Sequence, residues 1–175
     1  MIRLEPLEKR DYGQIVEWID SPKLLIQWGG TPFSYPLTKD DLREHYETDD
    51  GEAERLGFKA VADDHMVGSL ELDRIDREHD SAAISRVFVD PDERDRGVGA
   101  AMLREALEFG FEDHSLHRIH LAVFEFNEPA ISCYETVGFV REGVRRDSHY
   151  HDGEYWTTIQ MSMLEDEWWC LNDES

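Results

Sequence analysis

The sequence predicts a mixed α/β (α+β) domain in which most strands belong to one central sheet. Its 175 residues suit one domain with a single sizeable core. Hydrophobic residues make up 40% of the chain, which is enough for a globular fold. Strand-like and helical stretches alternate along it, with no internal repeat or linker between them. We therefore expect residues 1–175 to fold as a single domain.

The first third of the chain is expected to carry one strand and two helices. Thr38, followed three residues later by Asp41, is a capping signal for the second helix. Glycines, prolines and aromatic residues crowd the stretch before it, which predicts an irregular loop. The predicted elements, in order, are a strand at Ile2–Leu7, a helix at Tyr12–Ile19, a loop at Ser21–Pro36 and a helix ending near Tyr46.

The remainder is expected to alternate strands with two longer helices. The stretch Ala100–Phe111 has apolar residues at helical spacing, and Asn127 and Gly138 are the cap and stop signals of a second helix. Trp168 and Trp169 in the C-terminal tail are expected to pack against the fold. The predicted elements are strands at Leu56–Ala62, Met66–Leu72 (with a bulge at Gly68), Ala82–Val89, His117–Phe124, Phe139–Val144 and Tyr155–Met163, and helices at Ala100–Phe111 and Asn127–Val137.

The net charge of the chain is strongly negative. Forty acidic against 18 basic residues give −22, and the acids are spread along the sequence rather than gathered in one tail. Dispersed acid indicates a surface adapted to high salt, because molar salt screens the repulsion between carboxylates. An acidic protein of an ordinary organism, or one that attracts cationic substrates, is the alternative. Nucleic acid is not an expected partner, since phosphate backbones need a basic face.

The cellular location is expected to be the cytoplasm. No stretch approaches the roughly 18 apolar residues that span a bilayer, so no membrane association is expected. The first residues, MIRLEPLEKRDYG, contain no apolar run of signal-peptide length. Cys133 and Cys170 are the only cysteines, and their spacing indicates neither a disulfide framework nor a metal site.

The stretch VFVDPDERDRGVGAAML, from Val87 to Leu103, has the pattern of an anion-binding turn. A strand ends at Asp90-Pro91, and Gly97 and Gly99 then open a helix, where free N–H groups and the helix dipole favour negative charge. Acidic neighbours surround the two arginines of the turn, so main-chain N–H groups are expected to hold the anion. A glycine-containing helix start without a ligand is the alternative. Neither a Walker loop nor a dinucleotide fingerprint fits these glycines.

Two motifs together resemble the GNAT superfamily of N-acetyltransferases. Arg94-x-x-Gly97-x-Gly99 is similar to its coenzyme A pyrophosphate motif. About 30 residues later, Asn127-x-x-Ala130-x-x-x-Tyr134 and the Gly-Phe pair that follows resemble its second motif. The ending, from REGVRRD to LEDEW, resembles the branch of the ribosomal-protein N-terminal and spermidine acetyltransferases. The resemblance implies a single GNAT-like domain with a mixed, mostly antiparallel sheet flanked by helices.

The resemblance also implies acetyl-CoA as co-substrate and gives roles to individual residues. Asn127 and Tyr134 keep structural alternatives, because Asn127 can simply cap its helix and Tyr134 can simply pack. The implied roles are main-chain pairing of Val87, Phe88 and Val89 with the pantetheine arm, pyrophosphate binding by Arg94, Asp95, Arg96, Gly97, Val98, Gly99 and Ala100, a hydrogen bond from Asn127 to the coenzyme, and protonation of the leaving thiolate by Tyr134.

The general base is where this chain departs from the family. In the ribosomal-protein alanine acetyltransferases a glutamate on the strand before the asparagine deprotonates the amine, and the matching residue here is Ala122. We leave open several other residues and a base that acts through water. The candidates are His120 on the same strand face, Glu71, Ser85 and Glu125.

The expected function is acetyl transfer to a primary amine by direct attack, without a covalent acetyl-enzyme. Cys133 is accordingly expected to face away from the reaction. The acceptor is a small molecule or a peptide: a protein N-terminus, a polyamine, an amino acid or an aminoglycoside would fit. By analogy with the fold, the loop with Trp28, Phe33 and Tyr35 lines the acceptor pocket. An acyl-CoA sensor without turnover is the alternative function, and the resemblance leaves a homodimer open.

No metal site is expected. His114, His117 and His120 do not share one face, and no cysteine or carboxylate pattern completes a zinc site.

Overall fold

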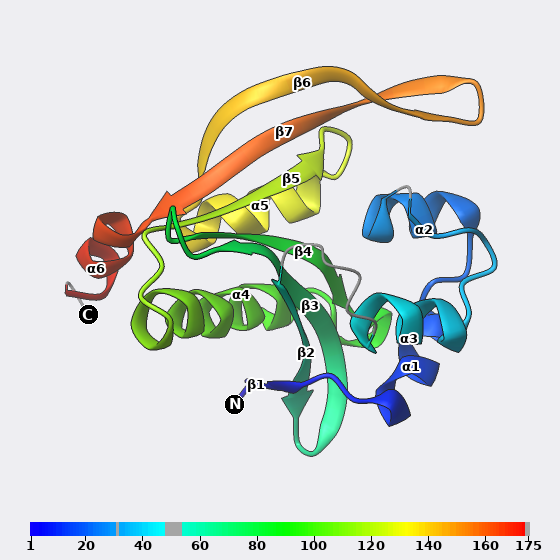
Figure 1. Ribbon diagram of the computed structural model, residues 1–175, viewed down its shortest axis with the longest axis horizontal. Coiled ribbons are helices and arrows are strands. Elements are labelled where there is room, and N and C mark those ends of the chain that lie inside the picture. The colour runs from blue at the N-terminus through cyan, green and yellow to red at the C-terminus, as the bar shows by residue number, and fades with distance from the viewer. Residues whose placement is uncertain (31, 48–53, 174–175) are drawn as a thin grey trace.

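The computed structural model describes residues 1–30, 32–47 and 54–173, which form one mixed sheet with helices packed against it (Figure 1). The strands are β1 (Arg3–Pro6), β2 (Glu54–Ala62), β3 (His65–Asp76), β4 (Ser81–Val89), β5 (Arg118–Phe124), β6 (Val140–His151) and β7 (Glu154–Leu164). The α-helices are α1 (Tyr12–Trp18), α2 (Pro22–Gly29), α3 (Lys39–Glu47), α4 (Val98–Glu108), α5 (Glu128–Val137) and α6 (Glu165–Asp173). Short helical turns are η1 (Lys9–Asp11), η2 (Pro91–Glu93) and η3 (Phe109–Asp113).

The sheet has seven strands in the order β1-β2-β3-β4-β5-β7-β6. Only β4 and β5 run parallel, joined by the crossover helix α4, and every other neighbouring pair is antiparallel. The expected mixed, mostly antiparallel α/β sheet flanked by helices is confirmed.

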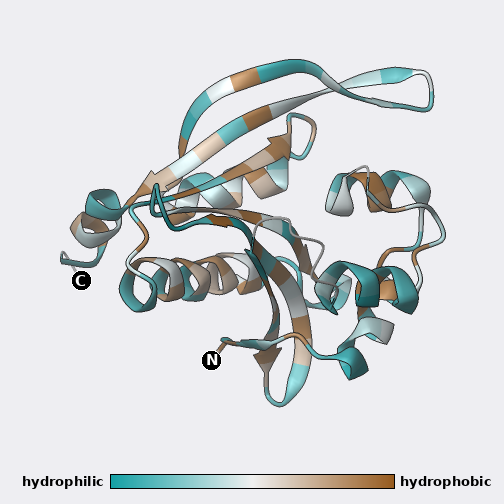
Figure 2. Cartoon of the chain, in the orientation of Figure 1, coloured by the Kyte–Doolittle hydropathy of each residue, from teal (hydrophilic) through white to brown (hydrophobic). Residues whose placement is uncertain are grey.

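Two hydrophobic clusters lie on opposite faces of the sheet. Along β4, Val87 and Val89 pack on the cluster formed with α4 and α5, whereas Phe88 belongs to the cluster of α1, α2 and α3. Successive side chains of a strand point to opposite faces, so β4 separates the two cores. Figure 2 shows the brown hydrophobic residues along α4 and the central strands, while β6 is largely teal.

Local signals placed several elements correctly. Thr38 and Asp41 form the expected capping box, with the Asp41 carboxylate accepting from Thr38 N at 2.8 Å. Asn127 caps α5 by accepting from Ala130 N, and Gly138 ends that helix with a left-handed backbone. The bulge expected at Gly68 is present, because the β2–β3 register shifts between its pairing with Ala60 and the next pair.

Two expectations about secondary structure were wrong, and one helix was not predicted. The stretch from Ser21 contains helix α2, which begins at Pro22 with Ser21 as its N-cap, because a local cap and the burial of Leu25 and Trp28 outweigh the loop-like composition. Strand β6 continues to His151, beyond the predicted end at Val144, since a long hairpin with β7 pairs its polar residues. The tail forms α6.

Only one of the two tail tryptophans packs as expected. Trp168 is buried against Phe111, and its indole N–H donates to Glu112 Oε1 at 3.1 Å. Trp169 points away and is exposed, because the two residues lie on different sides of α6.

Candidate active site

The central feature of the site is a gap between the parallel strands β4 and β5. They pair only at Ser81–Ala83 with Arg118–His120, and beyond these residues they separate (Figure 1). The rest of β4 therefore has a free main-chain edge, which runs through Val87–Val89. A cleft of about 1070 Å³ opens there, bounded by α2, β4, β5, the start of α4, and α5. An extended ligand can pair with such an edge as a further strand.

A bulge in β4 lies in the wall of this cleft. Between two pairs with β3, the strand advances three residues, from Ser85 to Phe88, against two in its partner. Arg86 sits at the extra position with a φ of +50°, which is unusual for a residue other than glycine. The indole N–H of Trp28 donates to the Arg86 carbonyl at 3.0 Å and so holds the bulge against α2.

The start of α4 forms another wall. Gly97 caps the helix with φ +78°, a left-handed conformation that glycine adopts without strain, and a Cβ there would meet no atom within 4 Å. Gly99 faces the cleft, and its absent Cβ would lie 3.4 Å from Cys133 Sγ. The first N–H groups of a helix have no partner within it, so those of residues 98–100 are free for an anion.

The charged residues of the turn differ in their position. The Arg94 guanidinium lies over the Phe88 ring at 5.4 Å from its centre, and Nε donates to the Val89 carbonyl at 3.4 Å. Asp95 lines the cleft, as do Val98 and Ala100. The Arg96 side chain instead pairs with Glu93 at 2.7 Å, is largely exposed, and does not line the cleft.

Helix α5 supplies the two polar side chains of the second motif. Asn127 lines the cleft, and its Oδ1 is used by the cap while its Nδ2 forms no hydrogen bond within the described residues. Tyr134 also lines the cleft with a buried ring that packs edge-on against Phe139. Burial raises the pKa of Tyr134 well above its usual value, so the phenol stays protonated.

The cysteine of this helix is not where it was expected. Cys133 borders the cleft beside Gly99, because its place next to Tyr134 on α5 turns it toward the start of α4. Burial raises the pKa of the Cys133 thiol, with a smaller opposing effect of Arg104. Such a thiol is a poor nucleophile at neutral pH.

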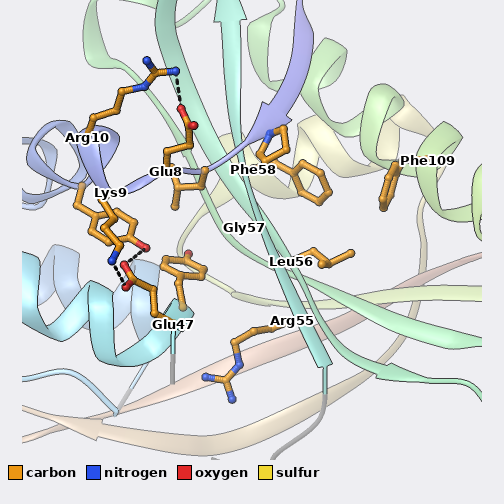
Figure 3. A pocket seen from close by; sticks show the side chains of 13 residues that line it. Glu8, Lys9, Arg10, Glu47, Arg55, Leu56, Gly57, Phe58 and Phe109 are labelled. Carbon is orange, nitrogen blue, oxygen red and sulfur yellow. Dashed lines mark hydrogen bonds and ion pairs between the residues drawn. The ribbon is translucent and has the colours of Figure 1, made fainter. Parts of the chain in front are cut away.

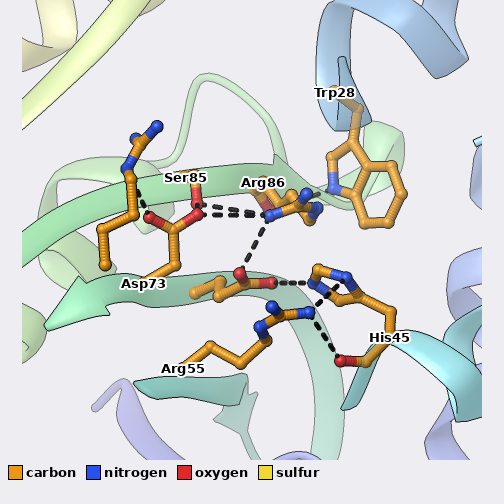
Figure 4. Close-up of polar contacts among 8 residues, drawn as sticks. Trp28, His45, Arg55, Asp73, Ser85 and Arg86 are labelled. Atoms are coloured by element: carbon orange, nitrogen blue, oxygen red, sulfur yellow. Dashed lines mark hydrogen bonds and ion pairs between the residues drawn. The ribbon is translucent and has the colours of Figure 1, made fainter. Parts of the chain in front are cut away.

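A buried polar network lies beside the cleft (Figure 4). Glu71 is fully buried between Arg86 Nη1, at 2.9 Å, and His45 Nε2, also at 2.9 Å. Burial alone would raise the pKa of Glu71, but the hydrogen bond from His45 and the charge of Arg86 outweigh it and hold this pKa below its usual value. Glu71 is therefore a structural counter-ion rather than a base for a substrate amine.

Asp73 is a cleft residue that sequence reasoning missed. Its Oδ2 accepts from Ser85 Oγ at 2.8 Å, and both residues line the cleft (Figure 4). The other oxygen, Oδ1, accepts no hydrogen bond from the described residues, although Arg74 Nε lies 3.0 Å away. Asp73 lies near the end of β3, and the bulge at Arg86 that it faces is 13 residues further along the chain. No pattern of neighbouring residues therefore marks Asp73 as a cleft residue.

The other positions considered for the general base either bring no titratable group or lie outside the cleft. Ala122 lines the cleft and brings no titratable group. His120 is half-buried, and burial first, then Arg74 and Arg118, lower its pKa, but it does not line the cleft. Glu125 is exposed and also lies outside the lining. His149 of β6, which was not among the candidates, does line the cleft.

Of the three aromatic residues expected in the acceptor pocket, only Trp28 lines the cleft. Trp28 lines the cleft and stacks with Phe33, whose ring also lies against the Arg86 guanidinium. Tyr35 is partly exposed, and its hydroxyl donates to the Asp20 carbonyl. The expected contribution to the pocket therefore comes from Trp28, at the end of a helix rather than in a loop.

A second hollow, of about 800 Å³, lies between η1, α3 and β2 (Figure 3). Lys9 pairs with Glu47 at 2.6 Å across it, and Phe58 and Phe109 form an apolar wall. No residue of either motif lines it.

Within residues 1–30, 32–47 and 54–173, no three His, Cys, Asp or Glu side chains come together in a way that could hold a metal ion. No helix in these ranges is long and apolar enough to cross a membrane.

Comparisons with known proteins agree with this geometry. The acetyltransferase (GNAT) family matches residues 17–139. A crystal structure of spermidine N-acetyltransferase from Vibrio cholerae, in complex with CoA and spermine, is 26% identical and covers 96% of this chain and 98% of its own, with a TM-score of 0.82. A structure described as a dodecamer of spermidine N-acetyltransferase from the same organism is 26% identical and covers 95% of both chains, with a TM-score of 0.77.

A relative with another acceptor is also similar. The L-amino acid N-acetyltransferase AaaT of Escherichia coli is 34% identical over 116 residues, which are 64% of this chain and 72% of that protein. The family match covers well over half of the chain and includes the β4 edge, the start of α4 and the whole of the second motif. With the separated strands and two motifs around one cleft, this chain belongs to the acetyltransferase (GNAT) family and is an N-acetyltransferase.

Proposed function

We propose that this enzyme transfers the acetyl group of acetyl-CoA directly to a primary amine of a small molecule or a peptide. The observation that carries the proposal is the free edge of β4, which lies between the glycine turn before α4 and the hydroxyl-bearing Tyr134. Coenzyme A needs three things that meet there: a strand edge for the pantetheine amides, N–H groups for the pyrophosphate, and a proton donor near sulfur.

In this proposal the main chain of Val87–Val89 pairs with the pantetheine arm. The turn from Arg94 to Ala100 holds the pyrophosphate, mainly through N–H groups, because Arg94 lies over Phe88 and Arg96 is paired with Glu93. Asn127 donates from its free Nδ2 to the coenzyme. The CoA-bound structure of the Vibrio relative supports the choice of cofactor.

The chemistry is a direct displacement. The neutral amine attacks the thioester carbonyl, which a main-chain N–H near Val89 polarises, and a C–N bond forms. The tetrahedral intermediate then collapses and the C–S bond breaks. Tyr134 donates its proton to the leaving thiolate and regains one from the amine nitrogen. The raised pKa of Tyr134 keeps the proton on the phenol until sulfur becomes negative. Burial raises the pKa of the Cys133 thiol, which makes it a poor nucleophile, so the proposal includes no covalent acetyl-enzyme.

The test is a binding measurement followed by a turnover assay. Isothermal titration with acetyl-CoA should show binding at one site per chain. The turnover assay measures release of the coenzyme A thiol with a panel of amines. The panel contains spermidine, spermine, L-amino acids, an aminoglycoside and an alanine-initiated peptide, and at least one of these should be acetylated. Binding without turnover of any amine would favour an acyl-CoA sensor, and absence of binding would remove both.

The remaining properties extend the proposal. We place the enzyme in the cytoplasm as one domain of residues 1–175, working at high ionic strength because of its charge of −22. A homodimer is proposed as the smallest assembly, and the dodecameric Vibrio relative supports association of such chains. Size-exclusion chromatography with light scattering at low and molar salt tests the assembly.

A further inference from the structure

The acceptor end of the cleft contains one imidazole in a position to accept a proton. His149 lines the cleft together with Tyr134, Val89 and Ala122. It is half-buried, and its ring lies edge-on against Phe124 at 5.0 Å between centres. Ala122 on β5 lines the same cleft and brings no titratable group, so β5 supplies no base at this position.

A bulge in β6 lies just before His149, whose side chain is on the same face of the strand as Arg145, the partner of the cleft residue Thr158. Between the pairs Arg145–Thr158 and His149–Trp156, β6 advances four residues while β7 advances two. The bulge is held by a hydrogen bond from Asp147 N to Thr157 Oγ1 at 3.1 Å. Bulges of this kind are common next to active sites.

The contacts of the neighbouring serine favour one tautomer of the imidazole. Ser148 Oγ lies 3.1 Å from His149 Nδ1, 3.3 Å from the Trp156 carbonyl and 3.1 Å from Thr158 Oγ1. We assign the single hydroxyl proton of Ser148 to the Trp156 carbonyl, because that carbonyl can only accept, whereas Nδ1 and Thr158 Oγ1 can also donate. Ser148 Oγ then accepts from Nδ1–H, and the lone pair of Nε2 stays free, since no hydrogen bond occupies it within the described residues.

We propose that His149 is the general base of the acetyl transfer, accepting a proton from the acceptor ammonium at Nε2. This inference rests on the proposed function. The ammonium loses one proton to Nε2 and becomes the neutral amine, which forms the new C–N bond as the C–S bond breaks. A second proton from the amine nitrogen replaces the one that Tyr134 gives to sulfur. The imidazolium finally releases its proton to solvent, so each turnover yields the amide, the thiol and one proton.

The surroundings keep this imidazole ready to accept. Burial first, and the charge of Arg145 second, lower the pKa of His149, so the ring is neutral at neutral pH. β5 and β7 place Phe124 and Trp156 against it, neither of which titrates in this range. Asp147 lies on its own strand. The nearest cation of α2, Lys23, is instead held over the Phe126 and Trp156 rings.

The experiment compares His149→Gln with a matched control on the same hairpin, His151→Gln. His151 packs on Trp156 and does not line the cleft. With saturating acetyl-CoA and spermidine, or an alanine-initiated peptide if spermidine is not an acceptor, kcat is measured from pH 5 to 9. The wild type should lose kcat as pH falls below the ordinary histidine range, because the protonated ring accepts no proton. His149→Gln should lower kcat about a hundredfold to ten-thousandfold and remove that limb.

Two readouts separate catalysis from structure. Acetyl-CoA affinity should stay unchanged in His149→Gln, and added imidazole should restore part of kcat in His149→Ala. A His149→Gln enzyme that keeps the parental kcat and acid limb overturns the inference, and so does a loss of kcat that imidazole does not restore. A wild type that binds acetyl-CoA and acetylates no amine removes the proposed function as well.

Discussion

The glycine turn before α4 permits a test in which charge is the only variable. A Cβ at Gly97 would meet no atom within 4 Å, so an aspartate or an asparagine fits there without a clash. Both residues would adopt the φ of +78° at a similar cost of about 1 kcal/mol. Gly97→Asp and Gly97→Asn therefore differ by one negative charge beside the proposed pyrophosphate.

The expected difference can be worked from Coulomb's law. For a carboxylate about 6 Å from a phosphate charge, the repulsion is about 0.7 kcal/mol in water and about 2.8 kcal/mol at an effective dielectric constant of 20. Gly97→Asp should thus bind acetyl-CoA about 3-fold to 100-fold more weakly than Gly97→Asn. In molar potassium chloride the screening length is about 3 Å, so the difference should largely disappear.

The assay is isothermal titration with acetyl-CoA at low and at molar salt, with melting curves to verify the fold. Gly153 provides the control, because it also has a positive φ and open space at its Cβ but lies in the β6–β7 turn. Gly153→Asp should leave the affinity unchanged. Equal affinities of Gly97→Asp and Gly97→Asn at low salt would refute the assignment of the pyrophosphate to this turn.

Three further outcomes are expected. Tyr134→Phe should lower kcat about a hundredfold or more with little change in acetyl-CoA affinity, and turnover at the parental rate would make Tyr134 structural. Melting temperature should rise from low to molar potassium chloride as the charge of −22 is screened, and a flat or falling curve would remove the high-salt proposal. Glu142→Gln should cost about 0.5–1 kcal/mol at pH 7, because Glu142 is exposed at 39% although Arg118 binds it at 2.6 and 2.7 Å. The hydrogen bond from Arg118 lowers the pKa of Glu142 to about 2. The stabilisation by this pair is therefore complete above the usual glutamate pKa and is lost as pH falls toward 2. A difference in melting temperature between Glu142→Gln and wild type that does not shrink on acidification would contradict this.

The turn proposed to hold the coenzyme, and the cap of α5, could be recognised in the sequence because their signals are local. Gly97 and Gly99 mark a helix start within a few residues of the strand that precedes them, and Asn127 caps its own helix. Helix α2 was missed for the opposite reason. Its cap at Ser21 is one weak local signal among glycines and prolines, and the burial of Trp28 that favours a helix depends on packing against β4.

The acceptor end could not be predicted, because it is assembled from segments far apart in sequence. The bulge at Arg86 and the longer one before His149 are register shifts, which depend on how partner strands pair rather than on the residues themselves. The single extra residue at Arg86 changes the face of the residues that follow, and the two extra residues before His149 change its position along β7. The resemblance drew attention to Ala122, which lines the cleft, but of its two neighbours on the same strand face only Phe124 does so, and His120 does not. If main-chain groups hold the coenzyme, as proposed, the acceptor chemistry can move between strands while the coenzyme motifs stay recognisable.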